Sequence, residues 1–370
     1  MIVGVPKEIK DNEKRVGLTP FGTSELVKLN HTVLIEKNAG RGSGFSDDMY
    51  KEAGAEIAES NIFIFDKSDL IIKVKEPQPN EVSLIKSNQI VFTFFHFAAD
   101  RELTTGIIDS GCAAIAYETV QNDDKSLPIL IPMSEVAGRM SVQNGAKCLE
   151  GNMGGKGKLL GGIPGVDSAT VTILGGGIVG SNAAKLAAGL GAKVYILDID
   201  MNRLRYLDDV MPPNVQTMYS DKHNIENLLS YTDLLIGSVL VVGAKAPKLV
   251  TKDMLGLMNS GSVIVDVAVD QGGCVETCKP TTHKDPTYEV NDVVHYCVSN
   301  MPGSVPYTST LGLTNITLPY IKELANNGIN VVKSNRSLLS GLNVKDGKIC
   351  HKGVAETFKL DFHEPLSLLQ

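Results

Sequence analysis

Three glycines with the spacing G-x-G-x-x-G lie between an apolar run and a stretch with helical periodicity. We expect Gly175 to make the tight turn, Gly177 to let a pyrophosphate approach, and Gly180 to let helix and strand pack closely. The start of the following helix then offers free N–H groups and the positive end of its dipole to phosphates. The order of strand, glycine turn and helix predicts a dinucleotide site.

The next predicted strand ends in an acid. Asp198 follows Gly180 by 18 residues, and a carboxylate there accepts hydrogen bonds from ribose hydroxyls and repels a 2′-phosphate. NAD is therefore favoured over NADP. Arg203 leaves NADP open, because an arginine close behind the acid can accommodate that phosphate. A glycine turn that binds nothing is the remaining alternative.

Further polar residues stand just past the ends of predicted strands, where open α/β sheets bind ligands. They are Arg15, Lys75, His96, Asp270, Asn300 and Met301. If the two sheets face each other across a cleft, these side chains converge beside the nicotinamide. Plainer alternatives stay open: Arg15 and Lys75 as solvated surface cations, and His96 as a buried histidine satisfied by a backbone carbonyl. Asp270, at the mouth of an apolar strand, favours a functional role.

The composition of the 370 residues is globular, with 43% hydrophobic and 21% charged residues. At about 150 residues per domain, this length predicts two or three domains. The 35 Lys and Arg against 42 Asp and Glu give a net charge of −7, which disfavours nucleic acid and anionic membranes as partners. Charge at Lys7 comes too early for a signal sequence, and the longest apolar stretch, 234–244, is far short of the ~18 residues that suggest a membrane span. We expect a cytoplasmic protein without a membrane partner.

The six cysteines are too few and too scattered for a disulfide scaffold, and this usage indicates a reducing compartment. Cys274 and Cys278 have C-x3-C spacing. Because no second pair follows at zinc-ribbon distance, buried or incidental thiols are favoured over a metal site. No metal is predicted.

Two runs of alternating strands and helices predict an α/β protein whose mostly parallel sheets are covered on both faces. The first run has a helix beginning at Thr19 and Pro20 and strands at 2–5, 32–35, 70–74, 90–95 and 113–116. The second has helices at 178–190 and 252–258 and strands at 171–174, 193–198, 215–219, 233–238, 262–267 and 294–298. Six strands in this rhythm make a complete dinucleotide-binding fold.

The segments outside these two runs complete the expected layout. A long helix capped by Ser134 reaches 150, and the glycine-rich stretch 151–165 is either a flexible connector or a mobile loop near the ligand. After Pro306, a helix at 318–327 and a hairpin with an Asp346-Gly347 turn pack back on the first domain. The fold class is thus two Rossmann-like, doubly wound domains with a cleft between them. We expect 1–130 plus 306–370 to form the substrate domain and 131–305 the NAD-binding domain.

Nearly the full length of the chain resembles the alanine dehydrogenase family, which is shared with the α chain of nicotinamide nucleotide transhydrogenase. The combination of matching segments is far more specific than any one of them. They are Gly4-Val-Pro-Lys-Glu-Ile9, Arg15-Val-Gly-Leu-Thr-Pro20, Val74-Lys-Glu-Pro77, 93–96, Ala116-Tyr-Glu118, Pro132-Met133-Ser134, 174–180, 263–273 and Asn300-Met-Pro-Gly303.

This resemblance implies reversible oxidation of L-alanine by NAD to pyruvate, ammonium and NADH. In that reading Arg15 pairs with the substrate carboxylate, and Lys75 hydrogen-bonds the carboxylate or the reacting carbonyl oxygen. His96 is the acid and base, since an imidazole with a pKa near ~6.5 takes and gives protons near neutrality. Asp270 positions ammonia or water and stabilises the cationic imine. Two further residues, Met133 and Asn300, help to hold the substrate.

The resemblance also implies a set of NAD contacts from the glycine turn, the strand ends and the loops after them. This set is Ser134, Gly175, Gly177, Ile178, Val179, Gly180, Asp198, Arg203, Ser220, Val239, Leu240, Val267, Ala268, Val269, Asp270, Val298, Ser299, Asn300 and Met301. The family is usually hexameric, so a homo-oligomer is expected. One departure, the bulky segment Phe94-Phe95-His96-Phe97, is a candidate for altering the preferred substrate size.

Three other functions fit the same architecture. A transhydrogenase α-chain-like subunit binds NAD but exchanges hydride with an NADP-binding partner, and it predicts a membrane-spanning extension or a docking loop. A saccharopine dehydrogenase-like enzyme needs a pocket for two long substrates. A non-catalytic NAD sensor keeps the fold and loses the chemistry, because fold alone does not imply function.

Overall fold

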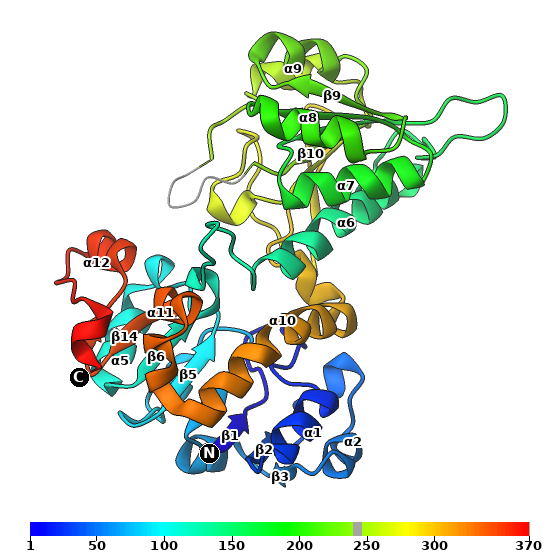
Figure 1. Cartoon of the computed structure of the whole chain (residues 1–370). Helices are drawn as coiled ribbons and strands as arrows, with labels where there is room; N and C mark the ends of the chain where they lie inside the picture. Colours follow the sequence, from blue (N-terminus) through cyan, green and yellow to red (C-terminus); the bar gives the residue numbers. More distant parts are fainter. Residues whose placement is uncertain (240–245, 370) are drawn as a thin grey trace. The chain divides into compact units, whose positions relative to one another are not determined.

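The computed structural model describes residues 1–239 and 246–369 and divides into two compact units (Figure 1). Unit 1 comprises Met1–Met133 and Val305–Gln370, and unit 2 comprises Ser134–Ser304. Each unit has its own mostly parallel sheet with helices around it. The predicted α/β class with two doubly wound domains is confirmed, and the cleft between them stays a prediction.

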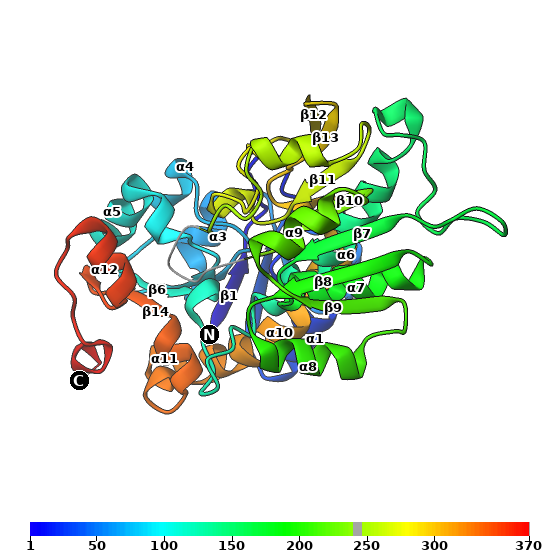
Figure 2. The same cartoon turned by 90° about the horizontal axis from the view of Figure 1, so that it is seen from above.

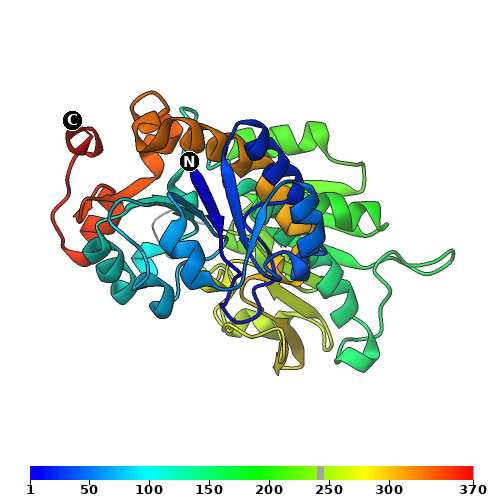
Figure 3. The same cartoon turned by 90° about the horizontal axis from the view of Figure 1, so that it is seen from below.

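The sheet of unit 1 has eight strands in the order β15-β14-β6-β5-β4-β1-β2-β3. Its first six strands are parallel in the doubly wound order 3-2-1-4-5-6. The C-terminal hairpin adds to the edge, where β14 runs antiparallel to β6 (Figure 3). The strands are β1 (Ile2–Val5), β2 (Thr32–Glu36), β3 (Glu56–Ala58), β4 (Leu70–Ile72), β5 (Ile90–Thr93), β6 (Ala113–Ala116), β14 (Leu342–Lys345) and β15 (Lys348–Ile349).

Helices cover both faces of this sheet. One apolar cluster joins Val3 and Val5 of β1 to Leu26 of α1 and Leu313 of α10. A second cluster, on the other face, includes side chains of α3, α5 and α12. The helices are α1 (Pro20–Lys28), α2 (Asp47–Glu52), α3 (Asn61–Lys67), α4 (Pro79–Val82), α5 (Arg101–Ser110), α10 (Pro306–Asn327), α11 (Arg336–Gly341) and α12 (Lys352–Phe358).

Unit 1 differs from the sequence expectation at several element ends. The strands predicted to reach 74 and 95 stop at Ile72 and Thr93, so Lys75 and His96 lie in loops rather than directly at a strand end. The short strand β3 was not predicted. The helix expected from 318 begins at Pro306 and continues through Pro319. Its first half is rich in threonine and serine, which have low helix propensity, but Ser309, Thr310 and Thr314 are buried, and tertiary packing overrides propensity.

The sheet of unit 2 has the order β12-β13-β11-β10-β7-β8-β9. Six of its strands are parallel in the same 3-2-1-4-5-6 order, and β12 pairs antiparallel with β13. Figure 2 shows β7, β8 and β9 side by side, with α7 packed along them. The strands are β7 (Thr170–Leu174), β8 (Lys193–Asp198), β9 (Val215–Tyr219), β10 (Leu234–Gly237), β11 (Val263–Asp266), β12 (Thr287–Val290) and β13 (Val293–Tyr296).

Three elements at or within unit 2 differ from the sequence expectation. The helices are α6 (Ile131–Cys148), which leads from unit 1 into unit 2, and α7 (Ile178–Gly189), α8 (Met201–Val210) and α9 (Lys222–Leu229). Ser134 is not a helix cap, because α6 begins at Ile131 with Pro132 in its first turn, where a missing N–H costs nothing. The α-helix expected at 252–258 is a short 3-10 helix, η5 (Asp253–Leu257). Strand β12 was not predicted.

The glycine-rich linker after α6 lies at the amino ends of the strands of unit 2. Lys158 places its ammonium 2.7 Å from a carboxylate oxygen of Asp233, and Lys156 pairs with the other oxygen. Asp233 precedes β10 and also accepts the N–H of Thr170 at 2.8 Å. The glycine turn lies at the opposite, carboxyl edge of this sheet, which favours the connector over a loop near the ligand.

Candidate active site

Four loops at the carboxyl edge of unit 1 carry the polar residues of interest. Arg15, Lys75 and His96 follow β1, β4 and β5, which are neighbours in the sheet, and Glu118 follows the adjacent strand β6. Because parallel strands present their carboxyl ends at one edge, the doubly wound order places these four loops along that edge. The sequence did not single out Glu118 as a functional residue, although it stands in one of the segments that carry the family resemblance.

Arg15 is buried, with 2% of its surface exposed, so the surface-cation alternative is wrong. Its guanidinium forms a two-pronged pair with Glu13, with Nε 2.7 Å from Oε1 and Nη2 2.5 Å from Oε2. Burial raises the pKa of Glu13, but the hydrogen bonds and charge of Arg15 outweigh this effect and lower the pKa to about 2. The third nitrogen, Nη1, lies 3.0 Å from the sulfur of Met133. This pairing fixes the guanidinium plane.

Lys75 is half-buried beside this pair. Burial lowers the pKa of its ammonium, and the positive charge of Arg15 lowers it further. The carbonyl of Lys75 accepts a hydrogen bond from the hydroxyl of Thr93 at 2.9 Å, which ties the loop after β4 to β5. The carboxylate of Glu13 thus partly balances the positive charges of Arg15 and Lys75. No sequence pattern predicted this partner.

A fully buried lysine supports the loop that carries Lys75. The Nζ of Lys73 lies 2.9 Å from Glu81 Oε1 and 3.2 Å from Glu8 Oε2, and none of the three side chains is more than 3% exposed. Burial lowers the pKa of Lys73, but the charges of Glu8 and Glu81 outweigh it and raise the pKa. Glu8 also accepts the N–H of Val74 at 2.6 Å. The Glu8–Lys73–Glu81 triad thereby anchors the start of this loop.

His96 is exposed, so the alternative of a buried, satisfied histidine is wrong. Its ring stacks on Phe94 with a centroid distance of 5.7 Å and an interplanar angle of 3°. Its backbone has φ of 53°, in the left-handed region that side chains seldom adopt. The N–H groups of Phe95 and His96 donate to the two oxygens of Glu118, at 3.2 and 2.5 Å. The imidazole therefore stands on a loop held in an uncommon conformation.

In unit 2 the three glycines of the fingerprint have three different surroundings. Gly175 has φ of 100°, and a Cβ on Gly180 would lie 1.9 Å from the carbonyl oxygen of Gly175, so the backbone requires both glycines. At Gly177, no described residue has an atom within 4 Å of where a Cβ would stand. Helix α7 begins at the next residue, Ile178. The open space at a helix N-terminus fits a pyrophosphate.

Asp198 and Arg203 both hold the glycine turn. One carboxylate oxygen of Asp198 accepts the N–H of Gly176 at 2.7 Å, and the other accepts the N–H of Asp200 at 2.9 Å. The Nε of Arg203 donates to the carbonyl of Gly176 at 2.5 Å. Ser220 donates its N–H to the carbonyl of Asp198 at 3.0 Å. Asp198 is half-buried at the end of β8, where it can still accept from ribose hydroxyls.

The loops after β11 and β13 meet at Asp270. The buried carboxylate of Asp266 accepts the N–H groups of Ala268 at 3.0 Å and Cys274 at 2.9 Å, which shapes the loop 267–273. Asp270 is exposed on this loop, and the hydroxyl of Ser299 donates to its carboxylate. Asn300 has φ of 58° and Met301 is buried.

The remaining expected NAD contacts lie on helices and in loops of the chain. Ser134 lies within α6, and Ile178 and Val179 lie in α7. Val267 and Val269 flank Ala268, Val298 precedes Ser299, and Val239 is the last described residue before the gap, whereas Leu240 lies outside the described residues.

Gly177 offers a direct test of the cofactor site. Because no described atom crowds it and its φ of −66° suits any residue, we expect Gly177→Ala to leave the melting temperature unchanged. Overpacking against a pyrophosphate costs about 1–3 kcal/mol, so NADH affinity should fall up to about 100-fold in a fluorescence titration. Gly189→Ala, at the opposite end of α7 and at an equally open position, is the matched control and should bind NADH like the wild type. Equal affinity of both variants would count against this placement of the pyrophosphate.

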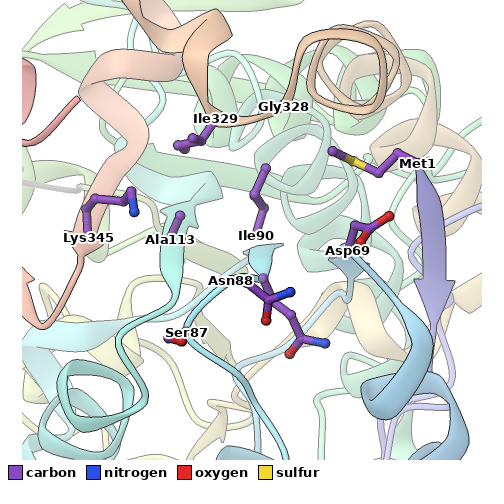
Figure 4. Close-up of a pocket in the computed structure, with 10 residues that line it drawn as sticks. Met1, Asp69, Ser87, Asn88, Ile90, Ala113, Gly328, Ile329 and Lys345 are labelled. Carbon is purple, nitrogen blue, oxygen red and sulfur yellow. The ribbon is translucent and has the colours of Figure 1, made fainter. Parts of the chain in front are cut away.

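A cavity of about 220 Å³ lies at the other edge of the sheet of unit 1 (Figure 4). Its lining includes Met1, Asp69, Ile90 and Ala113, which stand at or just before the amino ends of β1, β4, β5 and β6. The candidate substrate residues follow the carboxyl ends of these strands. This cavity is therefore not part of the candidate active site.

Neither a metal centre nor a membrane span is found in the parts of the chain that the structure describes. Across 1–239 and 246–369, no group of three or more His, Cys, Asp or Glu side chains is arranged to hold a metal ion. Cys274 is a buried free thiol and Cys278 a partly buried one. No helix in the same ranges combines the length and apolarity needed to cross a bilayer.

Two family models match the chain. Residues 4–137 match the alanine dehydrogenase/PNT N-terminal domain, and residues 141–352 match the alanine dehydrogenase/PNT C-terminal domain. An alanine dehydrogenase of Methanococcus maripaludis is 53% identical over 364 residues, which is 98% of each chain. Alanine dehydrogenase 2 of Staphylococcus aureus is 54% identical over 372 aligned positions, covering 100% of each chain.

Solved structures give the same picture. An L-alanine dehydrogenase superposes with a TM-score of 0.95 at 51% identity, covering 97% of this chain and 99% of that one. The transhydrogenase from Sinorhizobium meliloti superposes with a TM-score of 0.84 at 22% identity, covering 94% of this chain and 100% of that one. The second likeness shows a shared fold alone.

Proposed function

Because the chain belongs to the alanine dehydrogenase/PNT family, we propose that it catalyses the reversible oxidative deamination of L-alanine by NAD to pyruvate, ammonium and NADH. The observation that carries this proposal is the placement of Arg15, Lys75 and His96 after three neighbouring parallel strands. A guanidinium, an amine of lowered pKa and an imidazole are the groups that a 2-amino acid and its keto acid require. The full-length similarity to named alanine dehydrogenases supports the same activity.

The substrate carboxylate binds to Arg15 and Lys75. Glu13 holds the Arg15 guanidinium through Nε and Nη2, and Nη1 lies beside the sulfur of Met133, which fixes the orientation in which Arg15 meets the substrate. Lys75 hydrogen-bonds the carboxylate or the reacting carbonyl oxygen, and its lowered pKa lets it exchange a proton more readily than a surface lysine. Met133 packs against this end of the substrate.

Proton transfer is the task of His96. Its exposed imidazole removes a proton as water adds to the imine and returns one in the reverse direction. Asp270, which Ser299 holds by a hydrogen bond, stabilises the cationic imine and positions ammonia or water. Asn300, on a left-handed backbone next to Ser299, helps to hold the substrate.

The glycine turn, α7 and Asp198 would hold NAD, whose nicotinamide, when bound, supplies the acceptor for the hydride of the substrate α-carbon. The open space at Gly177 fits the pyrophosphate, and Asp198 would accept from the ribose hydroxyls. Arg203 donates its Nε to the carbonyl of Gly176, and the preference for NAD over NADP rests on the Asp198 carboxylate. These features of unit 2 support NAD as the cofactor.

The test is the near-ultraviolet absorbance of NADH with purified protein. L-alanine and NAD are expected to give NADH, and pyruvate with ammonium is expected to consume it. NADP, L-serine and glyoxylate serve as comparisons that measure cofactor preference and substrate breadth. NADH binding without turnover would overturn the enzyme in favour of a sensor, and hydride exchange that requires an NADP-binding partner would favour a transhydrogenase subunit.

The wider setting of the reaction belongs to the same proposal. We propose a cytoplasmic homo-oligomer, hexameric as the family resemblance implies, with L-alanine, pyruvate and ammonium as its small-molecule partners. Residues 1–130 plus 306–370 would be the substrate domain and 131–305 the NAD-binding domain. Sedimentation of the purified protein measures the oligomeric state directly.

A further inference from the structure

Glu118 lies beneath the loop that carries His96. It belongs to the 3-10 helix η3 (Tyr117–Thr119), which directly follows β6. Its two carboxylate oxygens accept two successive backbone N–H groups of the neighbouring loop, those of Phe95 at 3.2 Å and His96 at 2.5 Å. One side chain thus holds the backbone of the residue that carries the imidazole.

The backbone of His96 has a conformation that is uncommon for a residue with a side chain. His96 has φ of 53° and ψ of 38°, the left-handed region that is unfavourable for a residue with a Cβ. A non-glycine residue stays there only when the surrounding structure holds it. The two hydrogen bonds to Glu118, together with the stacking of the His96 ring on Phe94, supply that hold.

We propose that Glu118 is a positioning residue: as an anion it fixes the His96 backbone for proton transfer, and protonation of its carboxyl releases that backbone. A carboxylate has two acceptor oxygens, whereas a carboxylic acid turns one of them into a donor that faces an N–H group. Only the anion therefore accepts both hydrogen bonds at full strength. The inference rests on the proposed function, because it assigns His96 the proton transfer.

The surroundings of Glu118 place the protonation of its carboxyl in the pH range in which an enzyme works. Burial raises the pKa of Glu118 to about 7, because its hydrogen bonds to the backbone only partly offset the desolvation of the charge. The negative charge of Glu76, from the loop after β4, acts in the same direction. Glu76 itself is paired with Lys10, and His96 is the titratable group on the loop after β5. As pH falls through 7, Glu118 takes up a proton, and its hydrogen bonds to the N–H groups of Phe95 and His96 weaken.

The matched variants are Glu118→Gln, which keeps the size and removes the charge, and Glu118→Asp, which keeps the charge. In the alanine-oxidising direction, both Glu118 and His96 must be unprotonated, so the acid side of the plot of log kcat against pH should approach a slope of two in the wild type. We expect Glu118→Gln to lower kcat at pH 8 by about 10- to 100-fold, with a slope near one and little change in KM for L-alanine. Glu118→Asp should keep the slope of two with partial activity.

Asp100→Asn is the control for loss of a carboxylate that merely caps backbone. Asp100 is exposed, lies four residues after His96 and accepts the N–H of Leu103 at the start of α5, at 3.0 Å. This variant should keep both the kcat and the slope of the wild type. If Glu118 had a purely structural role, Glu118→Gln and Glu118→Asp would both have a lower melting temperature and the slope of the wild type, and the proposal would be overturned.

Hydrogen exchange followed by mass spectrometry gives a readout that does not depend on turnover. At pH 8, the peptide that spans 94–97 should exchange faster in Glu118→Gln than in the wild type and in Asp100→Asn. Equal exchange together with wild-type kcat and slope in Glu118→Gln would overturn the proposal. Absence of alanine oxidation by the wild type would instead overturn the proposed function, and the exchange data would still decide whether Glu118 holds the loop.

Discussion

Replacing His96 with alanine is expected to lower kcat for L-alanine oxidation by about 10²- to 10⁴-fold, the usual contribution of a positioned acid or base. The physical reason is the loss of the only imidazole in the four loops that follow β1, β4, β5 and β6, all of whose residues are among those that the structure describes. The glycine turn and Asp198 belong to the sheet of unit 2 and keep their contacts. NADH affinity in a fluorescence titration should therefore stay within about twofold of the wild type.

His223→Ala is the matched control for this prediction. His223 is an exposed histidine on α9, and its ring nitrogen contacts the side chain of Asn227 at 3.0 Å. Its removal should leave kcat unchanged. Comparable kcat values for His96→Ala and the wild type would show that another group transfers the proton, and the assignment of His96 would be wrong.

Replacing Lys73 with methionine is expected to lower the stability of the folded protein strongly. The substitution keeps most of the length and the apolar character of the stem but leaves Glu8 and Glu81 as two buried carboxyls without their cation. Removing one partner of a buried ion pair costs about 3–5 kcal/mol, because the remaining charge is uncompensated. Urea denaturation at pH 8 measures this loss as a shift of the unfolding midpoint.

The pH dependence of the Lys73→Met variant follows from the sign of the change. Burial raises the pKa of Glu8, and the charge of Glu81 acts in the same direction, so without Lys73 folding takes up a proton at Glu8 and stability is lost as pH rises. The deficit relative to the wild type should therefore shrink as the pH is lowered from 8 toward 5. Lys86→Met is the control: Lys86 pairs with Asp66 at 2.6 Å but is 46% exposed, and surface pairs contribute about 0–1 kcal/mol. An equal loss in both variants would contradict the role of the triad.

The doubly wound fold could be read from the sequence because its signals are local. Apolar runs of four to six residues mark the parallel strands of both sheets except β3, and Thr19 with Pro20 marks the start of α1. The hairpin turn at Asp346 and Gly347 was equally legible, since both residues adopt positive φ. Where the local signal was weak, prediction failed: the first half of α10 is a run of poor helix formers that only burial holds in a helix.

The positions of Arg15, Lys75 and His96 could also be predicted, because polar residues after parallel strands gather at one edge of a sheet. Their partners could not be predicted in this way. Glu13 and Glu118 can be recognised as partners only from contacts that form when the loops fold. The hydrogen bond from the His96 N–H to Glu118 joins two residues that are 22 positions apart in the chain. The buried Lys73 stands two residues before Lys75 with no sign in the sequence that one is a structural cation and the other a candidate substrate ligand.

The central claim is that this chain oxidises L-alanine by moving the hydrogen of the α-carbon to NAD. The most direct measurement uses L-alanine deuterated at that carbon and determines, by mass spectrometry, where the deuterium goes. We predict that NADH carries one deuterium for each pyruvate formed, and that His96→Ala lowers both products together. Pyruvate without deuterated NADH, or NADH binding with neither product, would contradict the claim.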